Sequence, residues 1–397
     1  MQAPAWVTLQ SIRQPPPQDP FSPNSASYAP NCPDPRPPSP GRAAGAYSAI
    51  FSPMEKEALD AIADELYGKL AGVSASVSPC LYDRAACERM APLVARIREL
   101  KRERNATILA HTYTGSEIVA GVADFTGDSY MLSKRASETE SDVIVFAAVR
   151  FMAETAKLLN PTKRVLLPAT DGRCSLADSI TAERVAELRK AHPDHVFVCY
   201  INTTAAVKAQ CDVCVTSGNV FKVVERIPSD KIFFLPDRLM GQNLRNELAK
   251  RGVKKEILTS DGACHVHESY DPELLDFLRL RNPGLKVLSH PECSEEIAER
   301  SDVVGSTEQM LRYIAGSCDD RFMLLTECGL AARVQCEYPG RTFVGSCQMC
   351  RYMKSNSLEG ILRVLENPAP EDEVTVPADV AEKALACIRK MFELAEG

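Results

Sequence analysis

A pattern that recurs three times at intervals of about 90 residues constrains this chain more than any other feature. Each copy has a short apolar run that ends in polar residues, followed about 15 residues later by a polar turn. The copies read LAHTY with ADFTGDS, CYIN with CDVCVTSGN, and SHPE with SDVVGST. The signature residues His111, Tyr200 and His290 lie 89 and 90 residues apart. Three matches in register indicate a triplicated unit.

Each copy of the repeat has the pattern of an α/β unit. Short runs rich in β-branched residues, such as DVIVFAA, HVFVCY and RFMLLT, alternate with helical patterns after about residue 105. Such alternation predicts mainly parallel sheets with helices packed against them. We therefore expect three Rossmann-like α/β/α domains over residues 105–195, 196–284 and 285–368. Pseudo-threefold symmetry would relate them around a central active site.

The segments outside the repeat differ from it in composition. Residues 1–53 hold 13 of the 27 prolines and few apolar residues, which predicts a disordered tail. A targeting peptide and a start codon placed too far upstream remain open alternatives for this segment. Residues 54–104 have patterns typical of N-terminal helices, and residues 369–397 of a linker and a last helix.

Composition excludes several classes of protein. The chain has 397 residues, of which 45% are hydrophobic and 25% charged, and its net charge is −7. It can bury a large core but lacks the basic excess of a general nucleic-acid binder. It has neither a run of about 18 apolar residues nor the layout of a secretory signal at its N-terminus. We expect a cytoplasmic protein that binds neither nucleic acid nor membranes.

Fifteen cysteines are many for a chain with no export signal. In a reducing compartment they are expected to be packing residues, metal ligands or catalytic thiols. Each copy of the repeat supplies one after its last strand, namely Cys174, Cys264 and either Cys347 or Cys350. Three convergent thiolates suit a metal, which could be zinc or a 4Fe–4S cluster with one iron left open. His265 and His267 follow Cys264 closely and could support its loop.

The remaining cysteines fit positions in the core. Cys211 and Cys214 form a CxxC pair around a predicted short strand, which favours packing over a redox motif. We expect packing roles for the others, which are Cys32, Cys80, Cys87, Cys199, Cys293, Cys318, Cys328, Cys336 and Cys387.

Polar side chains gather where the first strand of each copy ends. They are His111 and Tyr113, Tyr200 and Asn202, and His290 and Glu292. Ligands of open α/β sheets bind beyond the carboxyl ends of strands, so these residues are expected to face one cavity. Ser129, Ser217 and Thr307 lie in turns before predicted helices, where hydroxyl and free N–H groups bind anions. Each of the three could instead be only a helix cap.

These residues resemble the quinolinate synthase family. The matching stretches span about 107–365 and include FMAETAKLLNP, GRCSLADS, YINTT, HPEC and CQMCRYMKSN in the family's order. The resemblance implies three α/β/α domains and a transferase reaction of de novo NAD biosynthesis. In that reaction iminoaspartate condenses with dihydroxyacetone phosphate to give quinolinate, phosphate and water. The resemblance also implies a 4Fe–4S cluster with one open iron as Lewis acid, and a functional coupling to L-aspartate oxidase.

The resemblance assigns a role to each site residue. The cluster ligands become Cys174, Cys264 and Cys350, the last chosen over Cys347 because its CRYMK context matches the family. The groups expected to move protons are His111, Tyr113, His290 and Glu292. The groups expected to bind substrate are His111, Ser129, Tyr200, Asn202, Ser217, His290, Glu292 and Thr307.

Two other functions remain open. An iron–sulfur hydro-lyase acting on a small dicarboxylate would also use an open iron, but it would need no phosphate site. A zinc-stabilised scaffold would be colourless and loaded with zinc after anaerobic purification. An electron carrier is disfavoured because carriers usually hold their cluster by four protein ligands.

Overall fold

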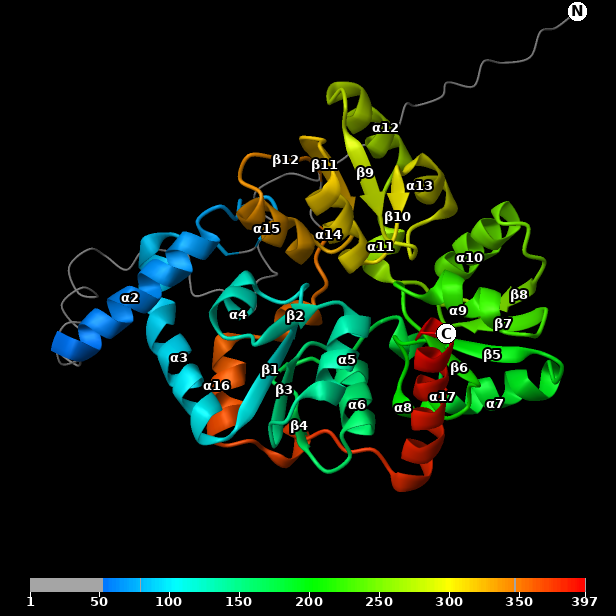
Figure 1. Cartoon of the computed structure of the whole chain (residues 1–397), viewed down its shortest axis with the longest axis horizontal. Coiled ribbons are helices and arrows are strands. Elements are labelled where there is room, and N and C mark those ends of the chain that lie inside the picture. The colour runs from blue at the N-terminus through cyan, green and yellow to red at the C-terminus, as the bar shows by residue number, and fades with distance from the viewer. Residues whose placement is uncertain (1–52, 79, 346–347, 397) are drawn as a thin grey trace, which may run out of the picture.

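Three four-stranded parallel sheets, each packed against helices, form the protein (Figure 1). The structure is a computed structural model that describes residues 53–396 except 79, 346 and 347. The sheets confirm the α/β class and the three Rossmann-like units. The proline-rich tail predicted for residues 1–53 lies outside the described residues, apart from Pro53. Within the described part of the chain, no helix has both the length and the apolar character needed to cross a membrane.

The three sheets share one topology, in which the first strand lies between the second and the third and the fourth is at the edge. The first sheet contains β1 (Ala106–His111), β2 (Phe125–Gly127), β3 (Val143–Ala147) and β4 (Arg164–Leu166). The second contains β5 (Val196–Tyr200), β6 (Val213–Val215), β7 (Lys231–Leu235) and β8 (Glu256–Thr259). The third contains β9 (Lys286–Ser289), β10 (Val303–Val304), β11 (Arg321–Leu325) and β12 (Thr342–Phe343).

Helices connect the strands and cover the sheets. The first unit has α4 (Ser116–Gly121), α5 (Ser129–Glu138) and α6 (Arg150–Leu159), followed by a 3-10 turn (Ala177–Ser179) and α7 (Ala182–Ala191). The second has α8 (Ala205–Lys208), α9 (Val220–Arg226), α10 (Arg238–Lys250), α11 (His265–Glu268) and α12 (Pro272–Arg281). The third has α13 (Glu295–Arg300), α14 (Thr307–Gly316) and α15 (Cys328–Glu337). The flanking segments form α2 (Pro53–Leu70), α3 (Arg84–Glu103), α16 (Leu358–Glu366) and α17 (Ala378–Glu396), with 3-10 turns at Met353–Ser355 and Pro370–Asp372.

An aspartate at the start of the second strand fastens the first two strands of every unit. In the second unit, Asp212 Oδ2 accepts the backbone N–H of Phe197 at 2.7 Å, and Arg189 holds the same carboxylate at 2.9 Å. The equivalent bonds join Ile108 N to Asp124 Oδ2 at 2.7 Å and Val287 N to Asp302 Oδ2 at 2.8 Å. Because the same contact recurs at the same place, the sequence repeat is also a repeat of local structure.

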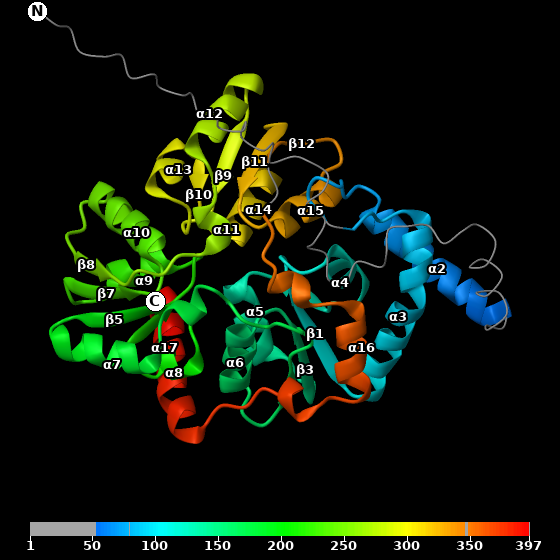
Figure 2. The same ribbon diagram turned by 180° about the vertical axis from the view of Figure 1, so that it is seen from behind.

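Two flanking elements tie the units together. Helix α16 returns to the first sheet, where it packs beside α3 (Figure 2). Helix α17 lies against the second unit and reaches the first, where the ring centroids of Phe392 and Tyr130 are 5.8 Å apart. Its last turn is held by Arg226, whose Nη1 donates to Leu394 O at 2.7 Å. The C-terminal helix therefore bridges two of the three units.

Three cysteines differ from their predicted role. Cys318 is exposed, so its predicted packing role is wrong. Cys80, which precedes α3, and Cys328, at the start of α15, are disulfide-bonded. The expectation that both are packing thiols is therefore wrong. Cys32 and Cys347 lie outside the described residues.

Candidate active site

The carboxyl ends of β1, β5 and β9, one from each sheet, meet at a single cavity. Its volume is about 70 Å³, which is room for a few water molecules. All twelve residues that the sequence predicted for the site line this cavity, although they come from segments up to 239 residues apart. They are His111, Tyr113, Ser129, Cys174, Tyr200, Asn202, Ser217, Cys264, His290, Glu292, Thr307 and Cys350.

The three cysteine loops are built in the same way. In each, a carbonyl two residues before the cysteine accepts the N–H of a residue at the start of the helix that follows the third strand. These bonds are Arg150 N to Gly172 O at 2.7 Å, Arg238 N to Gly262 O at 2.8 Å and Cys328 N to Gln348 O at 3.1 Å. By this repeat of structure, Cys350 is the equivalent of Cys174 and Cys264.

The electrostatics of the three thiols favour a bound cation. Burial raises the pKa of Cys174 to about 12 and that of Cys350 to about 11, and it holds the pKa of Cys264 well above its usual value. The charges of neighbouring cysteines raise the pKa of Cys174 and of Cys264 further, and the charge of Glu327 raises that of Cys350. A metal ion that binds the thiolates removes both penalties. Three soft sulfur donors at one cavity therefore fit a thiophilic metal centre that keeps a position open.

Backbone geometry prepares the same three sulfur atoms for negative charge. Backbone N–H groups two or three residues downstream donate to the sulfur atoms of Cys174, Cys264 and Cys350. In each loop the cysteine carbonyl also accepts the N–H four residues later, at 2.9 to 3.0 Å. The local turn thus points its amide dipoles at the sulfur, which stabilises a thiolate.

A continuous chain of hydrogen bonds crosses the cavity. The Tyr200 hydroxyl donates to Glu292 Oε1 at 2.6 Å, and Glu292 Oε2 lies 3.0 Å from His267 Nδ1. His267 Nε2 is 3.0 Å from Thr326 Oγ1, which is 2.5 Å from the Tyr113 hydroxyl. The chain joins side chains from all three units, so a proton could pass along it without leaving the protein.

The protonation states of these groups follow from their burial. Burial raises the pKa of Tyr113 and of Tyr200 well above its usual value, so both are donors at neutral pH. Burial also lowers the pKa of His111 and of His290 to about 3, so both rings are neutral. At Glu292 the effect of burial is outweighed by neighbouring histidine charge and two hydrogen bonds, which lower its pKa to about 2. Glu292 is thus an ionised carboxylate that faces neutral tyrosine and histidine side chains.

The three hydroxyls that could have been helix caps are not the capping groups of their helices. Asp128 caps α5 and Ser306 caps α14, so Ser129 and Thr307 each occupy the position after the cap. Ser217 precedes Asn219, which is the cap residue of α9, so the interpretation of the three as simple caps is wrong. Thr307 Oγ1 and Asn202 Oδ1 are buried and have no hydrogen-bond partner among the described residues. Since buried polar atoms are nearly always paired, these two atoms favour a polar ligand in the cavity.

A buried ion pair connects the third cysteine loop to the first unit. Glu327 is fully buried, and its carboxylate accepts the N–H of Cys350 at 3.2 Å and that of Gly329 at 2.6 Å. Lys354 Nζ lies 3.1 Å from the same carboxylate and donates to Tyr113 O at 2.7 Å. The backbone around Cys350 is therefore positioned by charge as well as by chain connectivity.

Comparison with known proteins decides the family. A family model described as "Quinolinate synthetase A protein" matches residues 95–393. The chain belongs to this family. The match covers all three sheets, both bridging elements and every residue that lines the cavity. The family thus accounts for the whole of the structure from the middle of α3 to the last turn of α17.

Bacterial relatives agree with the family match. A quinolinate synthase of Xylella fastidiosa (strain Temecula1) is 42% identical over 315 residues, which cover 79% of this chain and 91% of the relative. One from Agrobacterium fabrum is 43% identical over 323 residues, with the same coverage of each chain. One from Aquifex aeolicus is 41% identical over 314 residues, covering 77% of this chain and 95% of the relative.

Sequence reasoning missed several residues of this family member's site. Thr326 and Glu327 follow β11 directly, so the rule used for the other strand ends would have found them. His267 was given only a supporting place near Cys264, whereas it lies at the centre of the hydrogen-bond chain. Its position three residues after Cys264 was the available signal, because the N–H groups that bind the sulfur come from that turn.

Proposed function

We propose that this chain is a quinolinate synthase. It condenses iminoaspartate with dihydroxyacetone phosphate to quinolinate, with loss of phosphate and two water molecules, as a transferase of de novo NAD biosynthesis. The observation that carries the proposal is the meeting of all twelve predicted site residues at one cavity. Membership in the family and relatives named quinolinate synthase support it.

The proposed cofactor is a 4Fe–4S cluster held by Cys174, Cys264 and Cys350. When bound, such a cluster supplies a Lewis-acidic iron with one position open to substrate oxygen atoms. The equivalent loops and the mutual proximity of the three thiols support this ligand set. A different set, Cys264 with His267 and Glu292, has its ligand atoms within 4.8 Å of one another and could hold zinc. Zinc there would use both ends of the Glu292–His267 contact and interrupt the hydrogen-bond chain.

The proposed substrate-binding groups match the charges of the two substrates. Dihydroxyacetone phosphate and iminoaspartate bring a phosphate and two carboxylates. Ser129 and Thr307 offer hydroxyls at the N-termini of α5 and α14, where the helix dipole favours anions. Ser217 and Asn202 line the same cavity from the second unit. We assign these four residues, with Tyr200, to holding phosphate and carboxylate oxygens.

The proposed proton transfers use the hydrogen-bond chain. Glu292 is the ionised acceptor and takes the proton that substrate enolisation releases, with His267 held against its second oxygen. Tyr200 and Tyr113 remain protonated at neutral pH and deliver protons to departing oxygens. His111 and His290 are neutral and can either donate or accept at one ring nitrogen. We assign His111 to the step beside Tyr113, and His290 to the step beside Glu292.

The proposed domain boundaries are those of the repeat. Domains of residues 105–195, 196–284 and 285–368 each contain one sheet, and a pseudo-threefold axis through the cavity would relate them. Shared strand order and the recurrent aspartate and cysteine-loop contacts support this arrangement. Because imines hydrolyse in water, we further propose that the enzyme works in the cytoplasm beside the L-aspartate oxidase that supplies iminoaspartate.

The deciding experiment is an anaerobic assay with purified, iron-loaded protein. Freshly generated iminoaspartate and dihydroxyacetone phosphate are supplied, and quinolinate is measured by chromatography. Formation of quinolinate that stops after exposure to air is the expected result. Absence of quinolinate from protein with an intact brown cluster would contradict the proposal and favour a hydro-lyase acting on a dicarboxylate. Colourless, zinc-loaded protein would favour the scaffold.

A further inference from the structure

Four cysteines that the proposed function does not use meet where α17 packs on the second sheet. Cys199 lies on β5, Cys214 on β6, Cys211 in the turn before β6 and Cys387 on α17. Cys199 and Cys214 are fully buried, and Cys387 is 2% exposed. Nothing in the sequence connects Cys387 with the other three, because it lies 173 positions after Cys214.

Cys199 is the centre of this thiol cluster. Its Sγ lies 3.6 Å from Cys387 Sγ, which is van der Waals contact between sulfur atoms. Cys211 and Cys214 also hydrogen-bond to the Cys199 sulfur. A disulfide needs the two sulfur atoms of Cys199 and Cys387 to approach by a further ~1.5 Å, to about 2.05 Å. Cys387 is carried by a helix at the surface of the unit, where a side-chain rotation and a small shift can supply this approach.

The arrangement suits thiol chemistry better than metal binding. In a tetrahedral zinc site all ligand sulfurs lie about 4 Å from one another, given Zn–S bonds of about 2.3 Å. Among the described residues, the group of metal-ligand types within 4.8 Å of one another is Cys264 with His267 and Glu292, and no three of these four cysteines form such a group. The sulfur atoms of the other three cysteines therefore surround the Cys199 sulfur, and the four do not surround a point at which a metal ion could bind all of them.

A buried lysine gives Cys199 the charge environment of a reactive thiolate. Lys208 is fully buried, and its Nζ donates to Ile201 O at 2.8 Å and to Thr203 O. No carboxylate of the described residues forms an ion pair with it. Burial raises the pKa of Cys199, but hydrogen bonds from the three thiols and the charge of Lys208 outweigh burial and bring it well below its usual value.

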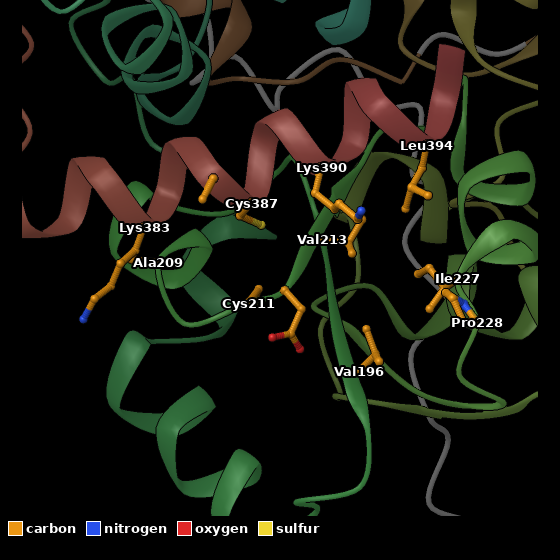
Figure 3. A pocket seen from close by; sticks show the side chains of 12 residues that line it. Val196, Ala209, Cys211, Val213, Ile227, Pro228, Lys383, Cys387, Lys390 and Leu394 are labelled. Carbon is orange, nitrogen blue, oxygen red and sulfur yellow. The ribbon is translucent and has the colours of Figure 1, made fainter. Parts of the chain in front are cut away.

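A cavity gives small molecules access to Cys211 and Cys387 of the thiol cluster, and Cys199, which does not line it, contacts Cys387 at 3.6 Å. The cavity has a volume of about 550 Å³ and is distinct from the active-site cavity, with which it shares no lining residue. Figure 3 shows Cys387 and Leu394 projecting from α17 over Cys211 and Val213 at its wall. The lining is mainly apolar. A small uncharged oxidant such as hydrogen peroxide can therefore enter the cavity without the desolvation cost that a charged molecule would have.

We propose that Cys199 and Cys387 form a redox pair that a hydroperoxide converts to a disulfide between β5 and α17. The Cys199 thiolate attacks one oxygen of hydrogen peroxide, the O–O bond breaks, and the departing hydroxide takes a proton to become water. Cys387 Sγ then attacks the resulting sulfenic sulfur, the S–O bond breaks, and the thiol proton leaves with the second water. Two thiols and one peroxide thus give one disulfide and two waters.

The disulfide would close a covalent link across the bridging helix. Helix α17 contacts the second unit through its cysteine face and the first unit through Phe392, which packs on Tyr130. The neighbouring residue, Ser129, lines the active-site cavity. The link joins residues 188 positions apart in the chain, so it restricts the unfolded chain strongly and should raise the temperature of unfolding.

The test is peptide mapping of the full-length chain. Reduced, anaerobically purified protein is treated with equimolar hydrogen peroxide, alkylated and digested without reductant. Besides any peptides linked through Cys80 or Cys328, we expect a linked pair of peptides containing Cys199 and Cys387, which dithiothreitol separates. Cys387→Ser should abolish the link, whereas the matched variant Cys318→Ser, at an exposed cysteine, should retain it. The readout does not depend on turnover, so it is independent of the proposed function.

Thermal unfolding provides the second measurement. Oxidation should raise the melting temperature of the parent protein and of Cys318→Ser, but not that of Cys387→Ser. A link from Cys199 to Cys211 or Cys214, oxidation of Cys199 only to sulfinic acid, or an unchanged set of free thiols would each overturn the proposal.

Discussion

Replacing Glu292 by glutamine tests the centre of the hydrogen-bond chain with almost no change in shape. The carboxylate is 2% exposed and accepts the Tyr200 hydroxyl at 2.6 Å. Its other oxygen lies 3.0 Å from His267 Nδ1. Glutamine can still accept from Tyr200, but its NH2 group must face His267, which requires the imidazole proton to sit on Nε2. The variant therefore loses the one ionised acceptor of the hydrogen-bond chain and changes the tautomer of His267.

The size of the effect follows from these contacts. Loss of a positioned general base costs a factor of about 10² to 10⁴ in rate, which corresponds to about 3–5 kcal/mol in the barrier. The pKa of Glu292 is lowered from 4.5 to about 2, which is worth about 3 kcal/mol of folding free energy. A carboxyl group whose pKa is lower in the folded than in the unfolded protein stabilises the fold fully at pH values above its unfolded-state pKa. This stabilisation is lost as the pH falls through its folded-state pKa. The stability difference between parent and variant should therefore shrink between pH 4.5 and 2.

The assay compares Glu292→Gln with Glu296→Gln, a matched change at an exposed glutamate four residues away. Turnover is measured anaerobically, metal content by elemental analysis and stability by urea denaturation. We expect Glu292→Gln to retain its metal and lose at least 100-fold in kcat, and Glu296→Gln to behave as the parent. Near-normal turnover of Glu292→Gln, or an equal loss in both variants, would refute the reasoning.

Three further changes probe the site and the repeat. Gly329→Ala should lower activity and the melting temperature, because its Cβ would lie 2.6 Å from the backbone oxygen of Thr112; Gly316→Ala, with open space around it, should not. Glu327→Gln should speed the loss of bound metal to a chelator, measured by absorbance, because the carboxylate holds the third cysteine loop; an unchanged rate would exclude this positioning role. Asp302→Ala should destabilise the protein by about 1–3 kcal/mol in urea, since a buried strand N–H loses its acceptor; a change below about 0.5 kcal/mol would contradict that.

The choice between Cys347 and Cys350 shows where sequence comparison within the chain reaches its limit. Alignment of the Gly-x-Cys pattern of the three copies favoured Cys347. A motif this short can be aligned at more than one position, so the alignment did not decide between the two cysteines. The backbone hydrogen bond from Cys328 N to Gln348 O lies two residues before Cys350, as the equivalent bonds lie two residues before Cys174 and Cys264. The structure therefore aligns Cys350 with those two cysteines. A hydrogen bond between distant segments is a property of the fold that no local spacing contains.

The strand ends were more predictable than the residues that support them. His111, Tyr200 and His290 could be located because a parallel sheet places its strand ends at one edge, and the repeat located that edge three times. Glu327 could not be placed in the same way, because its importance comes from Lys354 and the backbone of Cys350, which lie further along the chain.

The sequence by itself determined the α/β class, the three units and eleven of the twelve residues that line the site, because each depends on local periodicity or on a repeat that the chain carries within it. The twelfth, Cys350, was chosen over Cys347 on the family resemblance. Only the tertiary structure decided how those residues are connected. His267 and Thr326 complete the hydrogen-bond chain, and Cys387 reaches Cys199, through contacts between segments from different parts of the chain. Such contacts arise when apolar faces pack together, and packing depends on the shapes of all neighbouring elements at once.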